Sequence, residues 1–502
     1  TKRKETKRSS GQWNTRYIFA FLPLASFLFT TPTPPIDTKL FLSHSPLLYS
    51  FFPILSAFES HKKKEKDMAM AMAAGYGQIP FDEEMQKSFR PPPPFHDGAG
   101  DGDHHILKPY KKSNRLVSLD AFRGLCVFLM IVVDYGGSVF PIIAHSPWNG
   151  LHLADFVMPF FLFVVGISIA LVYKKAPNRP EATWKAVGRA AKLFLLGILL
   201  QGGFLHGLNS LTYGVDLERI RLLGILQRIS IGYIVGALCE IWLSRRTRRE
   251  VGILKSYYLH WFAAFAIIAV YLGLLYGLYV PDWQFFVPGE GYSDLPLDAH
   301  EYTASRMQVK CSVRGDVGPA CNSAGMIDRF VLGINHLYAK PVYKNLKECN
   351  ISSDKVVPES APSWCHAPFD PEGLLSSLTA AVTCLIGLQY GHVLAHLQDH
   401  KGRLENWCGF SVAFLVLGLF LALLGFPINK PLYSISYMLI TSATAGITFC
   451  ALYLLVDIYG YRWLTLPLEW MGKHALSIFI IVSSNLAVIV IQGFYWKSPE
   501  NN

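Results

Sequence analysis

The residues best suited to acid–base chemistry lie around the first two apolar segments of the chain. Asp134 follows the apolar run that ends at Val133, and His145 comes later in a stretch without Lys or Arg. An ionisable group at membrane depth is costly, which favours a functional role. An imidazole can take a proton from an amine near neutral pH. We therefore predict His145 as a general base, with Asp134 orienting it or balancing its charge. A purely structural histidine is the alternative.

Two arginines are candidates for contacts with an anionic or polar cofactor. Arg123 lies three residues after Asp120, so the two can pair on one helix face, or Arg123 can bind phosphate oxygens. Arg228 lies inside an apolar segment and must face away from lipid, either as a packed donor to carbonyl groups or as a ligand contact. We predict both arginines as cofactor-binding residues. The substrate is expected to contact three residues that follow His145: Trp148, Asn149 and Asp155.

Two further histidines raise the possibility of a metal site. His392 and His396 lie four residues apart and share one helix face near its predicted cytosolic end. The neighbouring sequence offers them no third ligand, and the chain has no Cys-x-x-Cys pair in its long loop. We therefore predict no metal.

These residues are set among long apolar segments. Of the 502 residues, 51% are hydrophobic and 16% are charged, whereas soluble domains carry about a quarter charged residues. Runs of about 20 apolar residues can cross a membrane as helices. We predict an all-α, polytopic transmembrane helix bundle of about nine to ten spans. The nine runs that we identify lie near 119–140, 153–173, 190–204, 222–243, 258–280, 373–394, 407–425, 432–456 and 470–492.

The formal charge of +10 is concentrated in the loops and at the amino end, because residues 1–67 alone hold 11 Lys or Arg and 5 Asp or Glu. Loop charge accounts for this basic balance, so we predict no nucleic-acid partner. Positive loops stay in the cytosol. The loops 174–192 and 244–255 are therefore predicted as cytosolic, and 141–152, 205–221 and 281–372 as lumenal or exterior.

The long loop 281–372 carries independent signs of a non-cytosolic location. It holds the glycosylation sequon at Asn350. It also holds four cysteines, which predict two disulfides with three alternative pairings. These disulfide candidates are Cys311, Cys321, Cys349 and Cys365.

The ends of the chain differ from its apolar middle. We interpret residues 1–67 as upstream sequence outside the native protein, because the first Met is Met68; a signal or transit segment is the alternative. Residues 68–114, with a proline run and a Gly/Asp-rich stretch, are predicted as a disordered cytosolic tail. The transmembrane domain is predicted over 115–492, and 493–502 as a truncated end.

The order of motifs in this domain resembles one family of transmembrane acetyltransferases, heparan-α-glucosaminide N-acetyltransferase. The first motif, 115–124, reads RLVSLDAFRG, and His145 begins the motif HSPWNGLHLAD. The other motifs that carry the resemblance are 134–137, 158–163, 166–168, 226–229, 325–329, 335–338, 369–374 and 427–437.

The resemblance implies a helical membrane enzyme, generally a homodimer, of the lysosome or a vacuolar endomembrane. Such an enzyme takes acetyl-CoA from the cytosol and acetylates a terminal glucosamine of heparan sulfate in the lumen. The family's active-site histidine falls on His145. The family has Asn where this chain has Asp134, and the chain lacks the family's amino-terminal lumenal domain, so the acceptor is open.

Three functions stay open on the sequence, besides a catalytically inactive scaffold. The first is acetyl transfer to an amino sugar or similar glycan. The second is acyl transfer to another glycan or to a lipid-linked acceptor. The third is a secondary transporter without chemistry, which also places polar residues and broken helices inside a bundle. Direct transfer and a covalent acetyl-His145 intermediate are both compatible with the residues.

Overall fold

The computed structural model describes part of the chain, all of it within one unit, Tyr110–Asn502. The described residues are 116–137, 140–173, 178–201, 203–205, 213–215, 220–244, 257–287, 305–338, 340–349, 361–483 and 494–496. The helices are α3 (Val117–Gly136), α4 (Ala154–Tyr173), α5 (Arg179–Gln201), α6 (Ile225–Leu243), α8 (Tyr258–Gly277), α10 (Ser323–Leu332), α11 (Leu374–His396), α12 (His400–Leu423), α13 (Ile435–Leu452), α14 (Arg462–Lys473) and α15 (Ala475–Ser483). The strands are β1 (Gly203–Leu205), β2 (Tyr213–Val215), β3 (Trp283–Val287), β4 (Ser305–Val309) and β5 (Phe494–Trp496).

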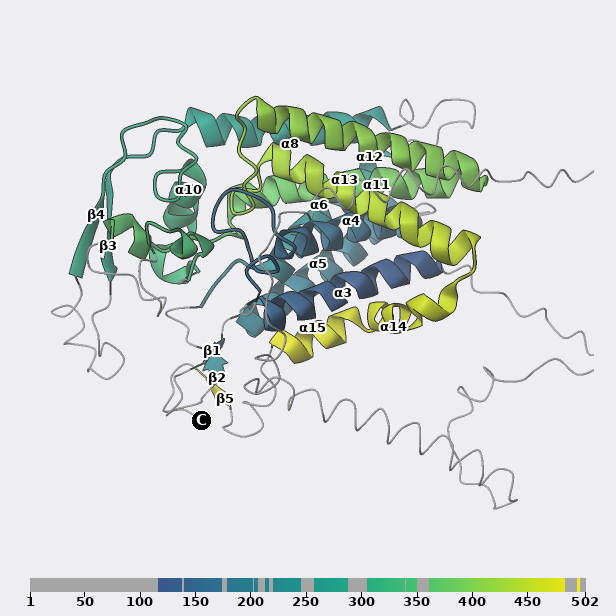
Figure 1. Cartoon of the computed structure of the whole chain (residues 1–502), viewed down its shortest axis with the longest axis horizontal. Coiled ribbons are helices and arrows are strands. Elements are labelled where there is room, and N and C mark those ends of the chain that lie inside the picture. The colour runs from purple at the N-terminus through teal and green to yellow at the C-terminus, as the bar shows by residue number, and fades with distance from the viewer. Residues whose placement is uncertain are drawn as a thin grey trace, which may run out of the picture. The chain divides into compact units, whose positions relative to one another are not determined.

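The described chain is mainly a bundle of long apolar helices, which run alongside one another in Figure 1. Six of them are long and apolar enough to cross a membrane: α4, α6, α8, α11, α12, and α13 with the π-helical turn that extends it to Ile458. The prediction of a helical membrane protein is therefore confirmed. The total of nine to ten spans stays a prediction.

The helices agree closely with the apolar runs, with two differences. The run predicted at 190–204 belongs to α5, which begins at Arg179, so 179–192 is helical rather than a loop. The first turns of α5 carry charged residues, so they do not look like part of an apolar run. Glu181 and Lys185 form an exposed ion pair of 2.6 Å one turn apart, which suits a helix. The run at 470–492 is divided at His474 into α14 and α15.

The centre of the bundle is the crossing of α4 and α11, where glycines bring the two backbones together. A Cβ on Gly166 would lie 2.1 Å from the carbonyl oxygen of Cys384, and a Cβ on Gly387 would lie 2.1 Å from that of Phe163. Small residues allow such close approach in membrane helices. α11 is the buried axis, since 94% of its apolar window is buried, against 17% for α12.

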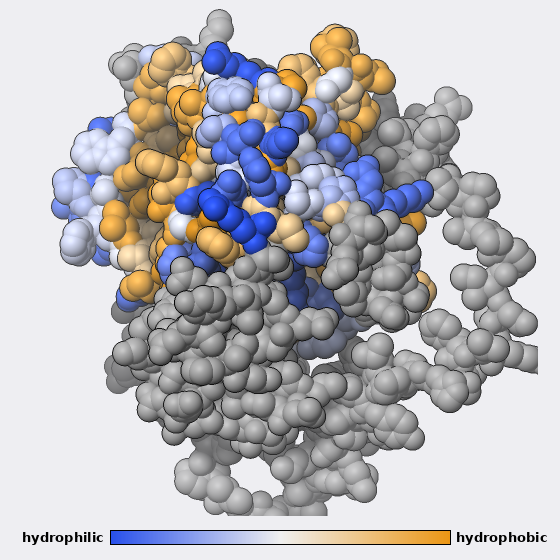
Figure 2. Space-filling model, turned by 90° about the vertical axis from the view of Figure 1, so that its left-hand side faces the viewer, coloured by the Kyte–Doolittle hydropathy of each residue, from blue (hydrophilic) through white to orange (hydrophobic). Residues whose placement is uncertain are grey.

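α8 and α12 carry the bundle's exposed apolar side chains. Phe262 and Phe265 of α8 are 71% and 64% exposed, and Leu423 of α12 is 86% exposed. Contiguous apolar exposure of this kind suits contact with lipid tails rather than water. Figure 2 views the unit from the end that carries β3 and β4, where hydrophilic residues gather in the middle and at the left edge, with hydrophobic residues between and above them.

One end of the bundle carries a small part outside the long helices, which we call the cap: residues 280–287, 305–338, 340–349 and 361–373. It contains α10 and the antiparallel strands β3 and β4 (Figure 1). Trp283 pairs with Val309 at one end of these strands, and Val287 pairs with Ser305 at the other. The protein is thus mostly rather than wholly helical. A second sheet, β1-β2-β5, pairs β2 antiparallel with β1 and parallel with β5.

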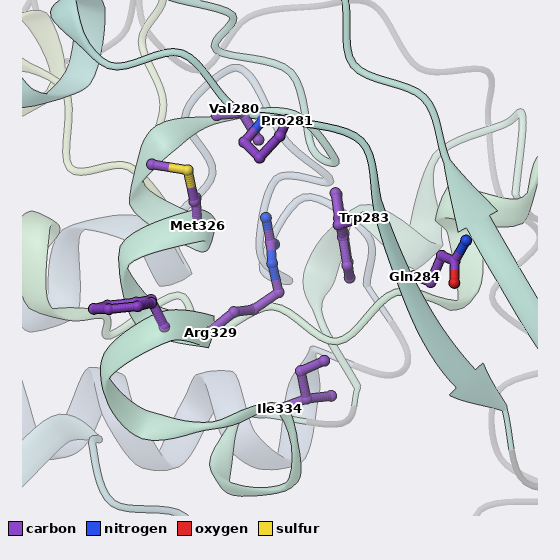
Figure 3. Close-up of a pocket in the computed structure, with 8 residues that line it drawn as sticks. Val280, Pro281, Trp283, Gln284, Met326, Arg329 and Ile334 are labelled. Carbon is purple, nitrogen blue, oxygen red and sulfur yellow. The ribbon is translucent and has the colours of Figure 1, made fainter.

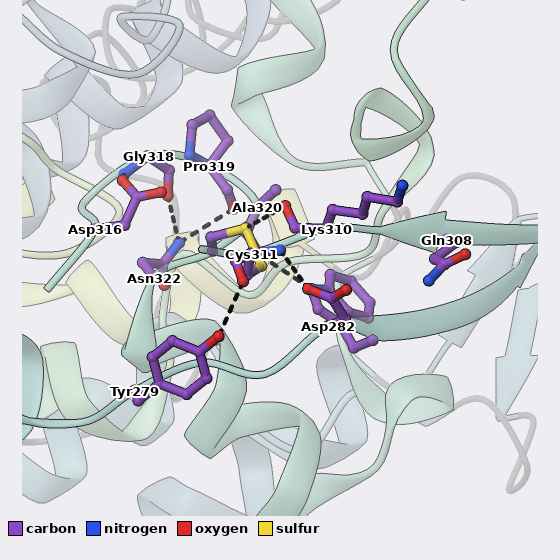
Figure 4. Close-up of a disulfide and its surroundings, with 12 residues drawn as sticks. Tyr279, Asp282, Gln308, Lys310, Cys311, Asp316, Gly318, Pro319, Ala320 and Asn322 are labelled. Atoms are coloured by element: carbon purple, nitrogen blue, oxygen red, sulfur yellow. Dashed lines mark hydrogen bonds between the residues drawn. A yellow bond between two sulfur atoms is a disulfide. The ribbon is translucent and has the colours of Figure 1, made fainter. Parts of the chain in front are cut away.

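The four cysteines of the long loop form two disulfides within the cap. They pair as Cys311–Cys321 and Cys349–Cys365. Around the first pair, the backbone N–H of Cys311 donates to Asp282 at 2.7 Å, and the Tyr279 hydroxyl donates to the Cys311 carbonyl at 3.2 Å (Figure 4). The disulfide prediction is confirmed and its pairing defined. The predicted glycosylation site, Asn350, lies outside the described residues.

The α4–α11 crossing yields a direct stability prediction. Gly387→Ala places a methyl group against the Phe163 backbone, so we expect destabilisation of about 1–3 kcal/mol. Gly409→Ala, on α12 with no atom within 4 Å of the added carbon, is the matched control and should be neutral or slightly stabilising. Thermal unfolding of both purified variants measures the difference. Equal melting temperatures would contradict the close backbone contact.

Candidate functional site

His145 lies in the loop between α3 and α4, at the end of the bundle that carries the cap. Two contacts attach this loop to the connection between α12 and α13: the N–H of Gly150 donates to the Ile428 carbonyl at 2.8 Å, and Asn149 forms a β-bridge with Asn429. The imidazole is held but accessible, because the His145 side chain is 40% exposed.

The partner of His145 is Asp155, the second residue of α4. The His145 Nδ1 lies 3.1 Å from Asp155 Oδ1. The other carboxylate oxygen accepts the backbone N–H groups of Ser146 at 3.2 Å and His152 at 2.9 Å. The Asp155 side chain is fully buried. A buried carboxylate needs charged partners and donors, and here the loop that carries His145 supplies three of its contacts.

Lys430, from the connection before α13, completes this cluster. Its ammonium lies 2.7 Å from His145 Nδ1 and 3.3 Å from Asp155 Oδ1. Burial lowers the pKa of Lys430 from its ordinary value, although the charges of Asp155 and Glu372 oppose that shift. The cluster therefore joins an imidazole, a carboxylate and an ammonium within hydrogen-bond distance.

A proline explains how α4 is held against α13 beside this cluster. Pro159 lies inside α4 and has no N–H to bond the carbonyl four residues earlier, which is that of Asp155. That carbonyl instead accepts the hydroxyl of Tyr437, a fully buried residue of α13. The missing helical bond thus becomes an interhelical bond at the residue that holds His145.

The position of the His145 proton decides what the cluster can do. With the proton on Nδ1, the ring donates to Asp155 and leaves Nε2 as a base. With the proton on Nε2, Nδ1 accepts from the Lys430 ammonium. Because both partners approach Nδ1, Nε2 is the nitrogen left to exchange a proton with a substrate.

Behind the cluster lies a second group of charges, which connects the cap with the bundle. Arg221 donates to both carboxylate oxygens of Asp370, at 2.9 and 2.6 Å, and to Glu372 at 2.6 Å. Burial alone would raise the pKa of Glu372, but the charges of Arg221, Arg228 and Lys430 lower it well below its ordinary value. Glu372 therefore remains ionised beside the site.

Arg228 lies in this second group rather than with Arg123. Its guanidinium donates to the Pro371 carbonyl at 2.6 Å and to Ser376, and it lies over the Tyr433 ring. The residue is 1% exposed. The structure therefore places it at the His145 end, as the packed donor to carbonyl groups that the sequence offered as one alternative.

Arg123 lies near the opposite end of the bundle and lines a cavity of about 510 Å³ between α3, α4, α11 and α12. It pairs with Asp120 at 3.1 Å and donates to Ser168 at 2.6 Å. Arg403 lines the same cavity. Asp155 and Ser168 lie on the same helix, about 20 Å apart at about 1.5 Å per residue.

The remaining predicted residues occupy different positions. Asp134, at the exposed end of α3, lies within electrostatic range of His145 and Lys430, but the carboxylate that pairs with His145 is that of Asp155. Trp148 is only 4% exposed and packs against Tyr343 and Phe369, which makes it part of the cap core rather than an open sugar platform. Asn149 is exposed and bonded to Asn429 at 3.1 Å.

The sequence reasoning missed Lys430, whose position 285 residues after His145 hides the contact. The only sequence signal for it was the motif at 427–437, which contains Lys430 and carries part of the resemblance. The cap also holds a separate cavity of about 250 Å³. In Figure 3, Arg329 extends from α10 toward Trp283, and its guanidinium carbon lies 3.7 Å from that ring's centroid.

Fold and site together define a multi-pass helical membrane protein with a buried carboxylate and a lysine beside an accessible histidine. A family model described as "Heparan-alpha-glucosaminide N-acetyltransferase, catalytic" matches residues 115–277, the part that carries Asp134, His145 and Asp155. The resemblance seen in the motifs is therefore confirmed.

Two curated relatives agree with this match. The mouse heparan-alpha-glucosaminide N-acetyltransferase is 28% identical over 391 residues, which cover 73% of this chain and 53% of the relative. The human protein of the same name is 29% identical over 415 residues, which cover 77% of this chain and 55% of the relative. The chain thus spans about half the length of the curated relatives that it matches.

The second charge group gives a prediction on stability and pH. Because the folded-state pKa of Glu372 lies below that of an unfolded glutamate, about 4.3, its contribution is present above that pH and lost as the pH falls further. Glu372→Gln should lower stability at neutral pH by about 1–3 kcal/mol.

Thermal unfolding of wild type and Glu372→Gln, measured from pH 7 downward, tests this. The difference should shrink as the pH falls below about 4.3. Glu405→Gln removes a carboxylate from an exposed ion pair with Lys401 and is the control, which should match wild type throughout. A difference that stays constant with pH would contradict the ionic role of Glu372.

Proposed function

We propose that this protein is a transmembrane N-acetyltransferase that moves an acetyl group from cytosolic acetyl-CoA to an amino sugar on the lumenal side. The acceptor that the relatives' name suggests is a terminal glucosamine of a heparan-type glycan. The observation that carries the proposal is the accessible imidazole of His145, held by the buried Asp155 within the matched region.

Each end of the bundle would bind one of the two substrates. The anionic nucleotide of acetyl-CoA suits the cavity lined by Arg123 and Arg403, because guanidinium groups pair well with phosphate oxygens. The long, thin arm that carries the thioester would then run between the helices toward His145. Arg228, which the sequence predicts as a cofactor-binding residue like Arg123, instead bonds to the start of α11 at the His145 end.

The chemistry requires one proton to leave the amine. Nε2 of His145 takes a proton from the attacking amino group while the nitrogen bonds to the thioester carbonyl carbon. The carbon–sulfur bond then breaks, and the CoA sulfur leaves as a thiolate that accepts the proton. Asp155 stabilises the imidazolium that forms in between, and the products are an N-acetyl sugar and CoA.

Finer points of the proposal stay predictions. A covalent acetyl-His145 route would release CoA before the acceptor binds, so labelled acetyl-enzyme formed without acceptor separates it from direct transfer. A screen of amino sugars, other glycans and lipid-linked sugars with labelled acetyl-CoA identifies the acceptor. Homodimer formation and a lysosomal or vacuolar location also remain predictions.

Removal of the base or of its partner tests the proposal directly. His145→Ala and Asp155→Asn should each lower the rate of acetyl transfer by about 10²–10⁴-fold, the usual contribution of general acid–base catalysis. Labelled acetyl-CoA and glucosamine, with protein purified in detergent, provide the assay. His366→Ala, in the cap, is the control and should retain the wild-type rate. Equal transfer by wild type and His145→Ala would refute the role of His145, and solute flux without transfer would favour a transporter.

The lowered pKa of Lys430 predicts the alkaline limb of the pH profile. Lys430 loses its charge at a lower pH than an ordinary lysine, about 10.4, after which Asp155 is no longer balanced. We expect kcat/KM to fall as the pH rises through the lowered pKa of Lys430, which lies below that of an ordinary lysine. Lys430→Arg keeps its charge and should move the limb to higher pH. Rates are corrected for uncatalysed thioester hydrolysis, and an unmoved limb would show that Lys430 does not control it.

A further inference from the structure

Three metal-ligand side chains from three helices meet at the end of the bundle away from His145. Glu240 of α6, His260 of α8 and His392 of α11 are all buried, and one donor atom from each lies within 4.8 Å of the others. The Nε2 atoms of His392 and His260 lie 2.7 and 3.3 Å from the same carboxylate oxygen of Glu240. No other such group of three occurs among the described residues.

His260 is the member whose position most needs an explanation. It is 1% exposed, and neither of its ring nitrogens makes a hydrogen bond of good geometry to any part of the chain that the structure describes. A buried polar group without a partner is destabilising. An ion between His260 and Glu240 would satisfy the Nε2 atom of this ring.

His392 is oriented as a metal-binding histidine should be. Its Nε2 faces Glu240, and its Nδ1 lies 3.4 Å from the side-chain oxygen of Gln389. A metal-bound imidazole commonly donates its other N–H to such an oxygen, which fixes the tautomer. The Tyr257 ring stacks on the imidazole, with centroids 3.5 Å apart and an angle of 10° between the planes.

We propose that Glu240, His260 and His392 bind a divalent transition-metal ion, Zn²⁺ in the first place. Two imidazoles and one carboxylate form a ligand set that tetrahedral Zn²⁺ accepts, with a water in the fourth position. Ligands at zinc distances lie about 3.3 Å apart, so the three donors need only small side-chain movements. The ion joins the ends of α6, α8 and α11.

This site is separate from the proposed acetyl-transfer chemistry. It involves His392 but not His396, whose Nε2 contacts the Tyr257 hydroxyl at 2.6 Å. The sequence analysis predicted no metal at His392 and His396 because no third ligand lies near them in the sequence. The true partners lie 152 and 132 positions before His392, because they come from other helices.

The test is the metal content of the full chain, purified through an affinity tag without histidine and incubated with Zn²⁺ before removal of free ion. We expect about one Zn²⁺ per chain, and a chelator should lower the melting temperature of the protein. His260→Ala should retain less than about a tenth of that zinc, because two ligands rarely hold the ion. His260→Cys, which restores a zinc ligand, should recover it.

His396→Ala is the matched control, because it removes a histidine one turn further along α11 and leaves all three proposed ligands in place. It should retain the wild-type zinc content. The proposal is overturned if wild type holds no zinc after incubation and its melting temperature changes with neither Zn²⁺ nor chelator. It is also overturned if His260→Ala binds as much zinc as wild type.

Discussion

The structure depends on the burial of one carboxylate, that of Asp155, at the start of a membrane helix. A fully buried charge is tolerated only when cations and donors surround it. Here the backbone of the α3–α4 loop, the imidazole of His145 and the ammonium of Lys430 supply them. The same contacts that make burial tolerable also fix the imidazole, so stability and chemistry use one set of interactions.

The helix that carries Asp155, α4, is fixed by close contacts with its neighbours α11 and α13. Glycines let α4 lie directly on α11, and Pro159 frees a carbonyl for Tyr437 of α13. α4 therefore connects the His145 end with the cavity that Arg123 lines, about 20 Å away. The proposed acetyl transfer across a membrane requires such a pair of sites, one at each end of the same helices.

Local patterns in the sequence predicted the parts of the structure that depend on near neighbours. The apolar runs located the helices, four cysteines in one loop predicted two disulfides, and the three-residue spacing predicted the pair of Asp120 and Arg123. The positions that could not be predicted depend on three-dimensional packing. Lys430 reaches His145 from 285 residues away, and Arg228 lies at the end opposite to Arg123. Neither position follows from periodicity or local charge.

The proposed acetyl transfer requires His145 and the Arg123 cavity to open toward opposite sides of the membrane. Cysteines introduced as His145→Cys and Leu171→Cys, the latter at an exposed residue lining the cavity, can be labelled with a membrane-impermeant maleimide in sealed vesicles. If the two sites open to opposite sides, the maleimide labels one of the two positions in intact vesicles and the other only after permeabilisation. Labelling of both positions from the same side would contradict it.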